Sequence, residues 1–470
     1  MVAVSESALS IPAFPGALGF GADSTGGRGG DVIKVTNLND SGAGSFRAAV
    51  EATGARIVVF ETSGIINLQS DLSITNPNLT IAGETSPGGI LITGYPTRFS
   101  TSDVIVRHIR FRVGSHQITS NGGNSDAEQH DAVQVWGSSS REVSDIIFDH
   151  VSVGWGIDEN FEFAYNPKNV TVQNSIISEG LTNAGHPKGS HGKGMLVWNK
   201  YSPDTRITIY NNFFGHNQDR NPEINTPANG TTIRAEVVNN IAFNWFGGIV
   251  MTSYTTTPIN YIGNYARKGP SSNASAWEAL HYASSGYTPG PYVYMNGNRG
   301  LNDDVSGVTE WRIAAGWRYS LQDEIWRRST PWDMSTTPMV ATVPSSAGWA
   351  NEMVTSVGAT VPVRDHVDQR VVDDFLASET SPQGSYLADV AYPADFPSFT
   401  DTPAPTDGDN DGMADSWETV NGMNTSANDS AADDDGDGYT NIEEYLHFLA
   451  AGSVGISLAI PPPNFKGSVK

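Results

Sequence analysis

The feature that most constrains the fold is a repeat of short apolar strands separated by one or two polar residues. When His150, Ser175, Asn212, Asn240 and Asn264 share one register, the spacings are 25, 37, 28 and 24 residues. A near-constant coil with occasional insertions is typical of a parallel β-solenoid, whose coils bury each other's apolar edges. The repeat runs from about Arg56 to Tyr265 and includes DVIVRHIRF (103–111), DIIFDHVSV (145–153), NVTVQNSII (169–177), RITIYNNFF (206–214), AEVVNNIAF (235–243) and PINYIGNYA (258–266).

Asparagine at the bends supports the same fold. Asn tolerates a left-handed backbone and can form hydrogen-bond ladders along a stack of coils. A β-propeller would give a longer period, and a β-sandwich would show more Asn-Gly or Asp-Gly hairpin turns. We therefore predict an all-β chain folded as a parallel β-helix (a solenoid) with long loops and a small C-terminal calcium-loop module.

The remainder of the chain does not follow the repeat. The stretch 267–403 is expected to wrap the β-helix or to cap one end. Within it, RDHVDQRVVDDFL (364–376) has apolar residues at helical spacing and predicts a short docking helix. The expected division is a β-helix domain at 1–403, with 267–403 as its irregular wrapping or capping segment, a calcium-binding module at 404–450, and a tail at 451–470.

The calcium-binding module is predicted from two acidic loops of one design. An EF-type loop of twelve residues wraps Ca²⁺ with alternate oxygens, a Gly at the sharp turn and a final bidentate Glu. The alternative is a solvated acidic linker. The first loop has Asp407, Asp409, Asp411, Gly412, Asp415 and Glu418 in this frame, and the second has Asp433, Asp435, Asp437, Gly438, Asn441 and Glu444.

Charge and composition exclude several classes of partner and site. The net charge of −24 argues against a nucleic-acid backbone as partner, and the absence of cysteine excludes disulfides and thiolate sites. No apolar run is long enough to span a membrane. Residues 1–10 lack the pattern of a signal peptide. Between Asp401 and Glu444 there are 13 acidic residues and no Lys or Arg, which sets this part apart in composition.

Three carboxylates stand out within the repeat. Asp131 opens the strand DAVQVW, and Asp158 and Glu162 flank the strand in GIDENFEF on the next coil. Stacked coils could bring these hard oxygen ligands together around Ca²⁺. The alternative is a set of solvated or hydrogen-bonded surface carboxylates. Lys193 and Arg220 lie just outside apolar strands, and their ordinary interpretation is as ion-pair partners.

Several motifs in order resemble the pectate lyases of polysaccharide lyase family 1, notably bacterial members with a paired calcium-loop tail. The resemblance covers nearly the whole chain. Its motifs are FPGALGFGADSTGGRGGDVIKVTNLNDSGAGSFRAAV (14–50), DVIVRHIRFRVG (103–114), DHVSVGWGIDENFEF (149–163), NNFFGHNQDRNP (211–222), RDHVDQRVV (364–372) and the ending DGDNDGMADSWE with DGDGYTNIEEYL.

The resemblance implies a right-handed parallel β-helix and a calcium-dependent β-elimination of (1→4)-linked galacturonan. It assigns calcium ligands to Asp131, Asp158 and Glu162, and a further one to Gln129, where an acidic residue is usual. It also implies that Arg220 is the catalytic arginine and Lys193 the substrate-binding lysine. Lys188 and His191 are further candidates for substrate contact. A secreted, monomeric enzyme is expected, without nucleic-acid or membrane partners.

In this chemistry the proton at C5, next to a carboxylate, is very weakly acidic until that carboxylate is neutralised. Calcium would also resolve how a protein of net charge −24 binds a polyanion. One departure concerns Glu223 and Asn225, which follow Arg220 where a second basic residue would often help bind substrate. A negative charge there costs affinity unless it pairs with a cation.

Three other functions are compatible with parts of the sequence. A polygalacturonase-type hydrolase needs paired carboxylates as acid and base, and its NTD and RIK strands are absent. A lyase on another uronate polymer or on methylated pectin is an alternative substrate choice, although methylated pectin would not require the acidic trio. A non-catalytic glycan-binding β-helix would tolerate loss of Arg220 and Lys193. The acidic tail resembles a dockerin that recruits a partner, but a stabilising module is favoured because calcium binding adds folding free energy.

Overall fold

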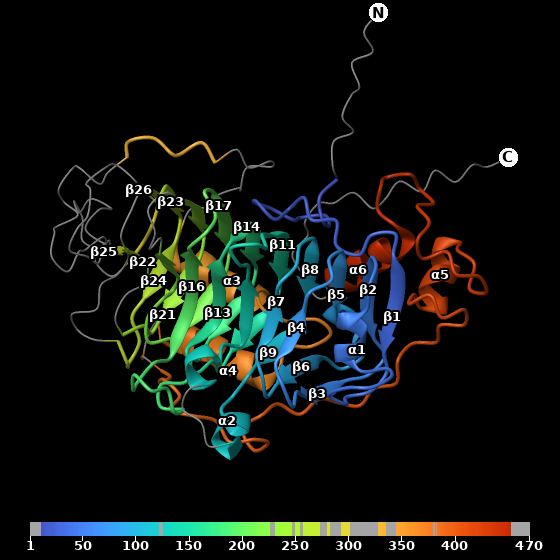
Figure 1. Ribbon diagram of the computed structural model, residues 1–470, viewed down its shortest axis with the longest axis horizontal. Coiled ribbons are helices and arrows are strands. Elements are labelled where there is room, and N and C mark those ends of the chain that lie inside the picture. The colour runs from blue at the N-terminus through green and yellow to red at the C-terminus, as the bar shows by residue number, and fades with distance from the viewer. Residues whose placement is uncertain are drawn as a thin grey trace, which may run out of the picture.

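The computed structural model describes residues 11–121, 126–225, 231–246, 250–253, 257–272, 280–282, 293–300, 328–334, 345–378, 381 and 383–452. In these residues the chain winds through three parallel sheets in turn, which confirms the predicted β-helix (Figure 1). None of the helices in the described part is long and apolar enough to cross a membrane.

Each coil adds one strand to each sheet, and neighbouring coils pair in parallel register. We name the sheets A, B and C. Sheet A contains β1 (Asp31–Val35), β2 (Arg56–Phe60), β5 (Leu79–Ala82), β8 (Val104–Arg107), β11 (Val143–Asp149), β14 (Pro167–Gln173), β17 (Thr205–Tyr210), β20 (Ile233–Val238), β23 (Ile259–Ile262) and β26 (Val293–Asn296). Sheet B contains β3 (Gly64–Asn67), β6 (Ile90–Thr93), β9 (Arg110–Arg112), β12 (Ser152–Gly154), β15 (Ile176–Ser178), β18 (Phe213–Gly215), β21 (Ile241–Phe243) and β24 (Tyr265–Arg267). Sheet C contains β4 (Leu72–Ile74), β7 (Thr97–Phe99), β10 (Val133–Trp136), β13 (Glu159–Tyr165), β16 (Lys193–Asn199), β19 (Glu223–Asn225), β22 (Val250–Ser253) and β25 (Leu280–Tyr282).

The core is a set of apolar columns that run along the stack. Phe148, Val172 and Ile209 are paired in register on successive strands of sheet A, and all three are fully buried. Alternate residues of a strand point to opposite faces, so this column lies inside the coils while its neighbours face outward. The strands β25 and β26 continue the coils into the stretch 267–403, where the sequence had shown no repeat.

The bend between sheets A and B carries an asparagine ladder. Each backbone amide at this bend donates to the asparagine side chain on the next coil, at 2.9 Å. The pairs are Ser175 to Asn212, Asn212 to Asn240, and Asn240 to Asn264. The first position of this ladder is Val151, whose amide donates to the Ser175 hydroxyl at 3.2 Å. The predicted register is therefore wrong by one residue at His150.

His150 instead occupies the bend position one residue earlier, together with Asn174, Asn211 and Asn239. These residues have left-handed backbones, with φ between 51° and 57°. Left-handed backbone and ladder hydrogen bonds thus belong to adjacent residues. A sequence pattern of polar pairs does not distinguish the two positions. This explains why the register predicted for His150 was wrong by one residue.

Helices cover parts of the outside. They are α1 (Phe46–Glu51), α2 (His116–Asn121), α3 (Ala347–Ser356), α4 (His366–Ala377), α5 (Asp415–Asn421) and α6 (Asn441–Ala451), with short 3₁₀ turns η1 (Gly83–Thr85) and η2 (Asp126–Gln129). α3 and α4 pack their apolar residues against the outer side of sheet B through Ile176, Phe213 and Phe243. The helix predicted at 364–376 agrees with α4, whose N-cap is Asp365.

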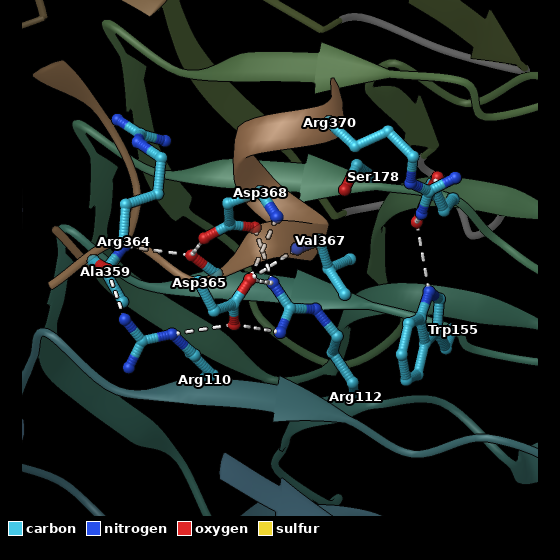
Figure 2. Close-up of polar contacts among 12 residues, drawn as sticks. Arg110, Arg112, Trp155, Ser178, Ala359, Arg364, Asp365, Val367, Asp368 and Arg370 are labelled. Carbon is cyan, nitrogen blue, oxygen red and sulfur yellow. Dashed lines mark hydrogen bonds and ion pairs between the residues drawn. The ribbon is translucent and has the colours of Figure 1, made fainter. Parts of the chain in front are cut away.

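A buried group of charges fixes α4 on sheet B (Figure 2). Arg112 of β9 pairs with Asp365 and Asp368 at 2.6 Å each, and all three are buried. Arg110 of the same strand also pairs with Asp365, at 3.0 Å. The Ser152 hydroxyl donates to the other oxygen of Asp368. The acidic C-terminal part, which contains α5 and α6, lies beside the first coils of the β-helix (Figure 1).

Candidate active site

The candidate residues meet where the loops from sheet B enter sheet C. Asp131 precedes β10, Asp158 precedes β13, Lys193 begins β16 and Arg220 precedes β19. These four strands are consecutive neighbours in sheet C. Because the strands are parallel, their first residues lie along one edge of the sheet. The fold therefore brings together four positions that span 90 residues of sequence.

Hydrogen bonds from backbone amides to carbonyl and carboxylate oxygens of neighbouring coils continue the sheet into this edge. The Glu159 amide donates to Asp131 Oδ1 at 2.8 Å, and the Lys193 amide donates to the Asp158 carbonyl at 3.1 Å. On the next coil the Met195 amide donates to the Arg220 carbonyl at 2.6 Å. These bonds fix the direction in which the side chains leave the backbone.

A compact carboxylate cluster lies at this edge. Ligand oxygens of Asp131, Asp158 and Glu159 lie within 4.8 Å of one another. Burial, together with the charge of Asp158, raises the pKa of Asp131 well above its usual value. Burial and the neighbouring Asp131 likewise raise the pKa of Glu162 well above its usual value. Such crowding of buried carboxylates is relieved by a cation, and hard oxygen donors fit Ca²⁺.

Asp158 differs from Asp131 and Glu162 in the direction of its pKa shift. Burial alone would raise the pKa of Asp158, but the hydrogen bond and charge of His191 and the charge of Arg220 outweigh burial and lower it. His191 Nε2 lies 2.7 Å from Asp158 Oδ1, and its ring stacks on His186 at 3.9 Å between centroids. His191, predicted to contact substrate, therefore holds a candidate metal ligand here.

Two residues of the site were not found by sequence reasoning. Glu159 joins the carboxylate cluster, and its position beside Asp158 in the same DEN tripeptide was the available indication. Gln134 is paired in register with Glu162 and donates from Nε2 to Asp131 Oδ2 at 2.8 Å. The same Nε2 donates to the Gln129 carbonyl at 2.9 Å. Gln129 itself, predicted as a ligand through its amide, is exposed and uses its backbone in this contact.

The candidate cations are all paired with carboxylates. Lys193 Nζ lies 2.8 Å from Asp219 Oδ2, and Lys188 Nζ lies 3.4 Å from Glu128 on the exposed rim. Arg220 contacts Glu159 through Nη1 and Glu223 through Nε, the latter at 2.8 Å. Glu223 thus pairs with a cation, which reduces but does not cancel the repulsion that its charge would exert on an anionic ligand. Burial raises the pKa of Glu223 even though Arg220 opposes the shift.

The first acidic loop of the C-terminal part places most of its carboxylates in two close groups that share Asp411. Oxygens of Asp407, Asp409 and Asp411 form one close group, and those of Asp411, Glu418 and Asp429 form another. Asp429, which lies outside the twelve-residue frame, was not predicted. Asp415 instead accepts a hydrogen bond from the Gly408 amide at 2.7 Å.

The second acidic loop is more open. Asp433, Asp435 and Asp437 are exposed, and Asp433 accepts hydrogen bonds from the amides of Gly436 and Gly438 at 2.8 and 3.0 Å. Asn441 is buried and accepts from the Asp434 amide at 3.3 Å. Burial and the nearby Asp435 raise the pKa of Glu444 to about 7. The side chains turn toward backbone amides of their own loop, as in an EF-type loop.

Known proteins resemble this chain both in sequence and in fold. No family model matches the chain. A relative named "Probable pectate lyase C" from Emericella nidulans is 34% identical over 454 residues, which cover 96% of this chain and 95% of the relative. A protein of the same name from Aspergillus terreus is 33% identical over 458 residues, covering 96% and 97%. The chain belongs to the pectate lyase family.

Membership of the pectate lyase family agrees with the resemblance of the quoted motifs. The near-full-length relatives reported above are fungal, whereas the motifs had resembled bacterial members. Among solved structures, jun a 1, the major allergen from cedar pollen, superposes with a TM-score of 0.54 at 16% identity, covering 73% of this chain and 92% of the allergen. For this pectate lyase family member, that likeness supports the β-helix fold.

Proposed function

We propose that this protein cleaves (1→4)-linked galacturonan (pectate) by calcium-dependent β-elimination and releases unsaturated oligogalacturonides. The observation that carries the proposal is the meeting of a buried carboxylate cluster with Arg220 and Lys193 on one edge of sheet C. The relatives named pectate lyase support the same choice of substrate. We also propose that the protein is secreted and acts as a monomer.

The calcium site of the proposal consists of Asp131, Asp158, Glu162 and Glu159, with Gln129 at the rim. When bound, Ca²⁺ would neutralise the uronate carboxylate beside C5. The cluster fits this role because two of its carboxylates, Asp131 and Glu162, have strongly raised pKa values and so favour a nearby cation. Gln134 and His191 hold Asp131 and Asp158 in place through the hydrogen bond and close contact described above.

The chain's own cations carry the rest of the chemistry. Lys193 would bind a substrate carboxylate, with Lys188 at the rim. Arg220 would lie at C5, either removing the proton or stabilising the negative charge that develops there. In β-elimination the C5 proton leaves, a C4–C5 double bond forms, and the C4–O bond breaks so that the leaving oxygen takes up a proton. Because ordinary arginine has a pKa above about 12, removal of the proton by Arg220 requires alkaline conditions or a local change.

For the C-terminal part we propose two structural calcium sites. The first uses Asp407, Asp409, Asp411 and Glu418 and is completed by Asp429. Glu418 and Asp411 are fully buried, and burial raises the pKa of Glu418 to about 7 and of Asp411 to about 6. The second site uses Asp433, Asp435, Asp437 and Glu444, with Asn441 and Asp415 as supporting groups in their respective loops.

The test is the ultraviolet absorbance of the unsaturated product on polygalacturonate, with Ca²⁺ and with EDTA. We expect absorbance to rise with Ca²⁺ and to vanish with EDTA and in Arg220→Ala. Arg206→Ala is the matched control, because Arg206 lies on sheet A, where it pairs with the neighbouring Asp204. If product forms only from alginate or methylated pectin, the protein is still a lyase but its substrate differs from the one proposed. If the folded protein forms no unsaturated product from any uronate polymer, a non-catalytic glycan-binding β-helix would be favoured.

A further inference from the structure

Aromatic side chains line the outward face of sheet C beyond the carboxylate cluster. Trp136 of β10 and Trp198 of β16 are both paired in register with Ala164 of β13, so two indoles flank one small residue. Both indoles are partly exposed. Tyr165 ends β13, and Tyr201, just after β16, is 41% exposed. A large exposed aromatic group next to a candidate site is a feature of ligand surfaces.

These aromatic rings form a continuous row. The Tyr165 ring lies 5.6 Å from Trp136 and 5.0 Å from Trp198, both edge-on. It also stacks on Tyr201 at 6.2 Å with an interplanar angle of 19°. Packing against Tyr165 holds the rings in fixed orientations, which lowers the entropy lost when a ligand binds.

A cation stands over the outer end of the row. Lys200 Nζ lies 5.3 Å from the Tyr201 ring centroid and 6.0 Å from that of Trp198. Lys200 is exposed, and within the described residues it forms no ion pair with a carboxylate. This contrasts with Lys193, Lys188 and Arg220, each of which already has an acidic partner. Lys200 is therefore available to an external anion.

The inner end of the row contacts the candidate site. Trp136 Nε1 donates to Glu162 Oε2. The Arg98 guanidinium lies 4.2 Å from the Trp136 ring and donates from Nε to Gln134 at 2.9 Å. Since Gln134 holds Asp131, the aromatic row and the carboxylate cluster share one hydrogen-bond network. Along β13, Tyr165 lies three positions beyond Glu162, roughly 10 Å, so the row lies away from the carboxylate cluster.

We propose that Trp198, Tyr201 and Lys200 form a subsite that binds an ionised uronate ring of the glycan at a distance from the scissile bond. Aromatic faces pack against the apolar C–H face of a sugar ring, and the Lys200 ammonium pairs with the ring's carboxylate. A methyl-esterified ring would keep the stacking but lose the ion pair. The identity of the glycan rests on the proposed function, whereas the acidic-sugar chemistry rests on these contacts.

The test uses Tyr201→Ala and Lys200→Gln in the full chain. On polygalacturonate we expect KM to rise roughly fivefold in each, with kcat within about twofold of the wild-type value, because the contact acts equally in ground and transition states. Phe448→Ala and Lys168→Gln are controls, since Phe448 is exposed on α6 and Lys168 is partly exposed on sheet A, where it pairs with Glu142. Tyr201→Phe keeps the ring and is expected to keep the wild-type KM. Unchanged KM in both test variants overturns the subsite.

Direct binding separates this proposal from the proposed function. Tryptophan fluorescence is titrated with saturated trigalacturonate and with its trimethyl ester, whether or not the protein shows lyase activity. Lys200→Gln should weaken binding of the acid but not of the ester, and Tyr201→Ala should weaken both. If both ligands lose affinity equally in Lys200→Gln, the pairing of Lys200 with the carboxylate is wrong. If the wild-type protein binds neither ligand, there is no subsite.

Discussion

Arg220 is placed between two carboxylates, and this arrangement decides how an anionic substrate can approach. Its Nε pairs with Glu223 at 2.8 Å while Nη1 contacts Glu159. A substrate carboxylate that approaches Arg220 therefore also comes close to the carboxylate of Glu223, which repels it. Because Glu223 is 7% exposed, solvent screens that charge less than it would at an open surface.

Glu223→Gln should lower KM for pectate about threefold to tenfold, equivalent to ~1 kcal/mol of removed repulsion. Glutamine keeps the size of the side chain, and its carbonyl can still accept from Arg220 Nε. The measurement is steady-state kinetics at two ionic strengths, with the smaller effect expected at high salt. Glu51→Gln on α1, exposed and remote, is the control. A fall in kcat with unchanged KM would mean instead that Glu223 acts by orienting Arg220.

At the residue scale the sequence could identify side chains but not their contacts. Asp131 and Asp158, with Lys193 and Arg220, were predicted from motifs, and the fold brings them to one edge. Glu159 and Gln134 were missed because their roles depend on pairing between coils. Glu159 lies opposite Lys193, and Gln134 lies opposite Glu162. Insertions of unequal length between strands hide this register from a single sequence.

At the scale of elements, α4 is held by charges that are removed from water. Arg112 is buried between Asp365 and Asp368, and Figure 2 shows the three side chains converging between β9 and the helix. Taking charges out of water is costly, so each partner is needed once the others are buried. The same helix also places Arg370 against the buried Glu179 at 2.8 Å.

Asp368→Ala should destabilise the protein by ~3–5 kcal/mol, because it leaves Arg112 with one of its two carboxylates and removes the acceptor of Ser152. Asp373→Ala is the matched control on the same helix, since Asp373 is exposed and should change stability by less than about 0.5 kcal/mol. Urea unfolding followed by circular dichroism measures both. Equal midpoints for the two variants would show that the charge group contributes little to the docking of α4.

The elements differ in how well the sequence predicts them. The coils follow from alternation of apolar and polar residues, and α4 follows from helical spacing in VDQRVVDDFL with Asp365 as cap. α3 was not predicted, because Ala347–Ser356 has only three buried residues, Ala350, Met353 and Val354. The strands β25 and β26 were also missed, although β26 ends at an Asn-rich bend where Asn298 accepts from the Asn264 amide at 2.9 Å and continues the ladder.

At the scale of the whole molecule, the acidic C-terminal part packs on the first coils. Ile442, Leu446 and Met413 contact the outward residues Ile57 and Val59 of β2. Lys34 of β1 pairs with Asp407 of the first acidic loop at 2.6 Å, and Arg28 pairs with Glu443 at 2.9 Å. A change in the charge of the acidic loops is therefore expected to alter the stability of the first coils of the β-helix.

Calcium should stabilise this end more at pH 8 than at pH 5. Burial, reinforced by neighbouring carboxylates, raises the folded-state pKa of Glu418 and Glu444 to about 7, above the ordinary 4.5. Without calcium the folded state therefore binds more protons than the unfolded state between these values, so stability falls as pH rises through that window. Bound calcium replaces those protons, and at a hundred times its Kd it contributes ~2.7 kcal/mol per site.

The measurement is the thermal midpoint with EDTA and with Ca²⁺ at both pH values. Glu418→Gln should remove much of the calcium-induced rise at pH 8 and should raise the midpoint in EDTA at that pH, because it deletes a buried negative charge. Glu162→Gln reports the same quantities for the candidate active site, because the pKa of Glu162 is also raised. A calcium-induced rise that is as large at pH 5 as at pH 8, or that survives intact in Glu418→Gln, would place the stabilising ion away from the first acidic loop.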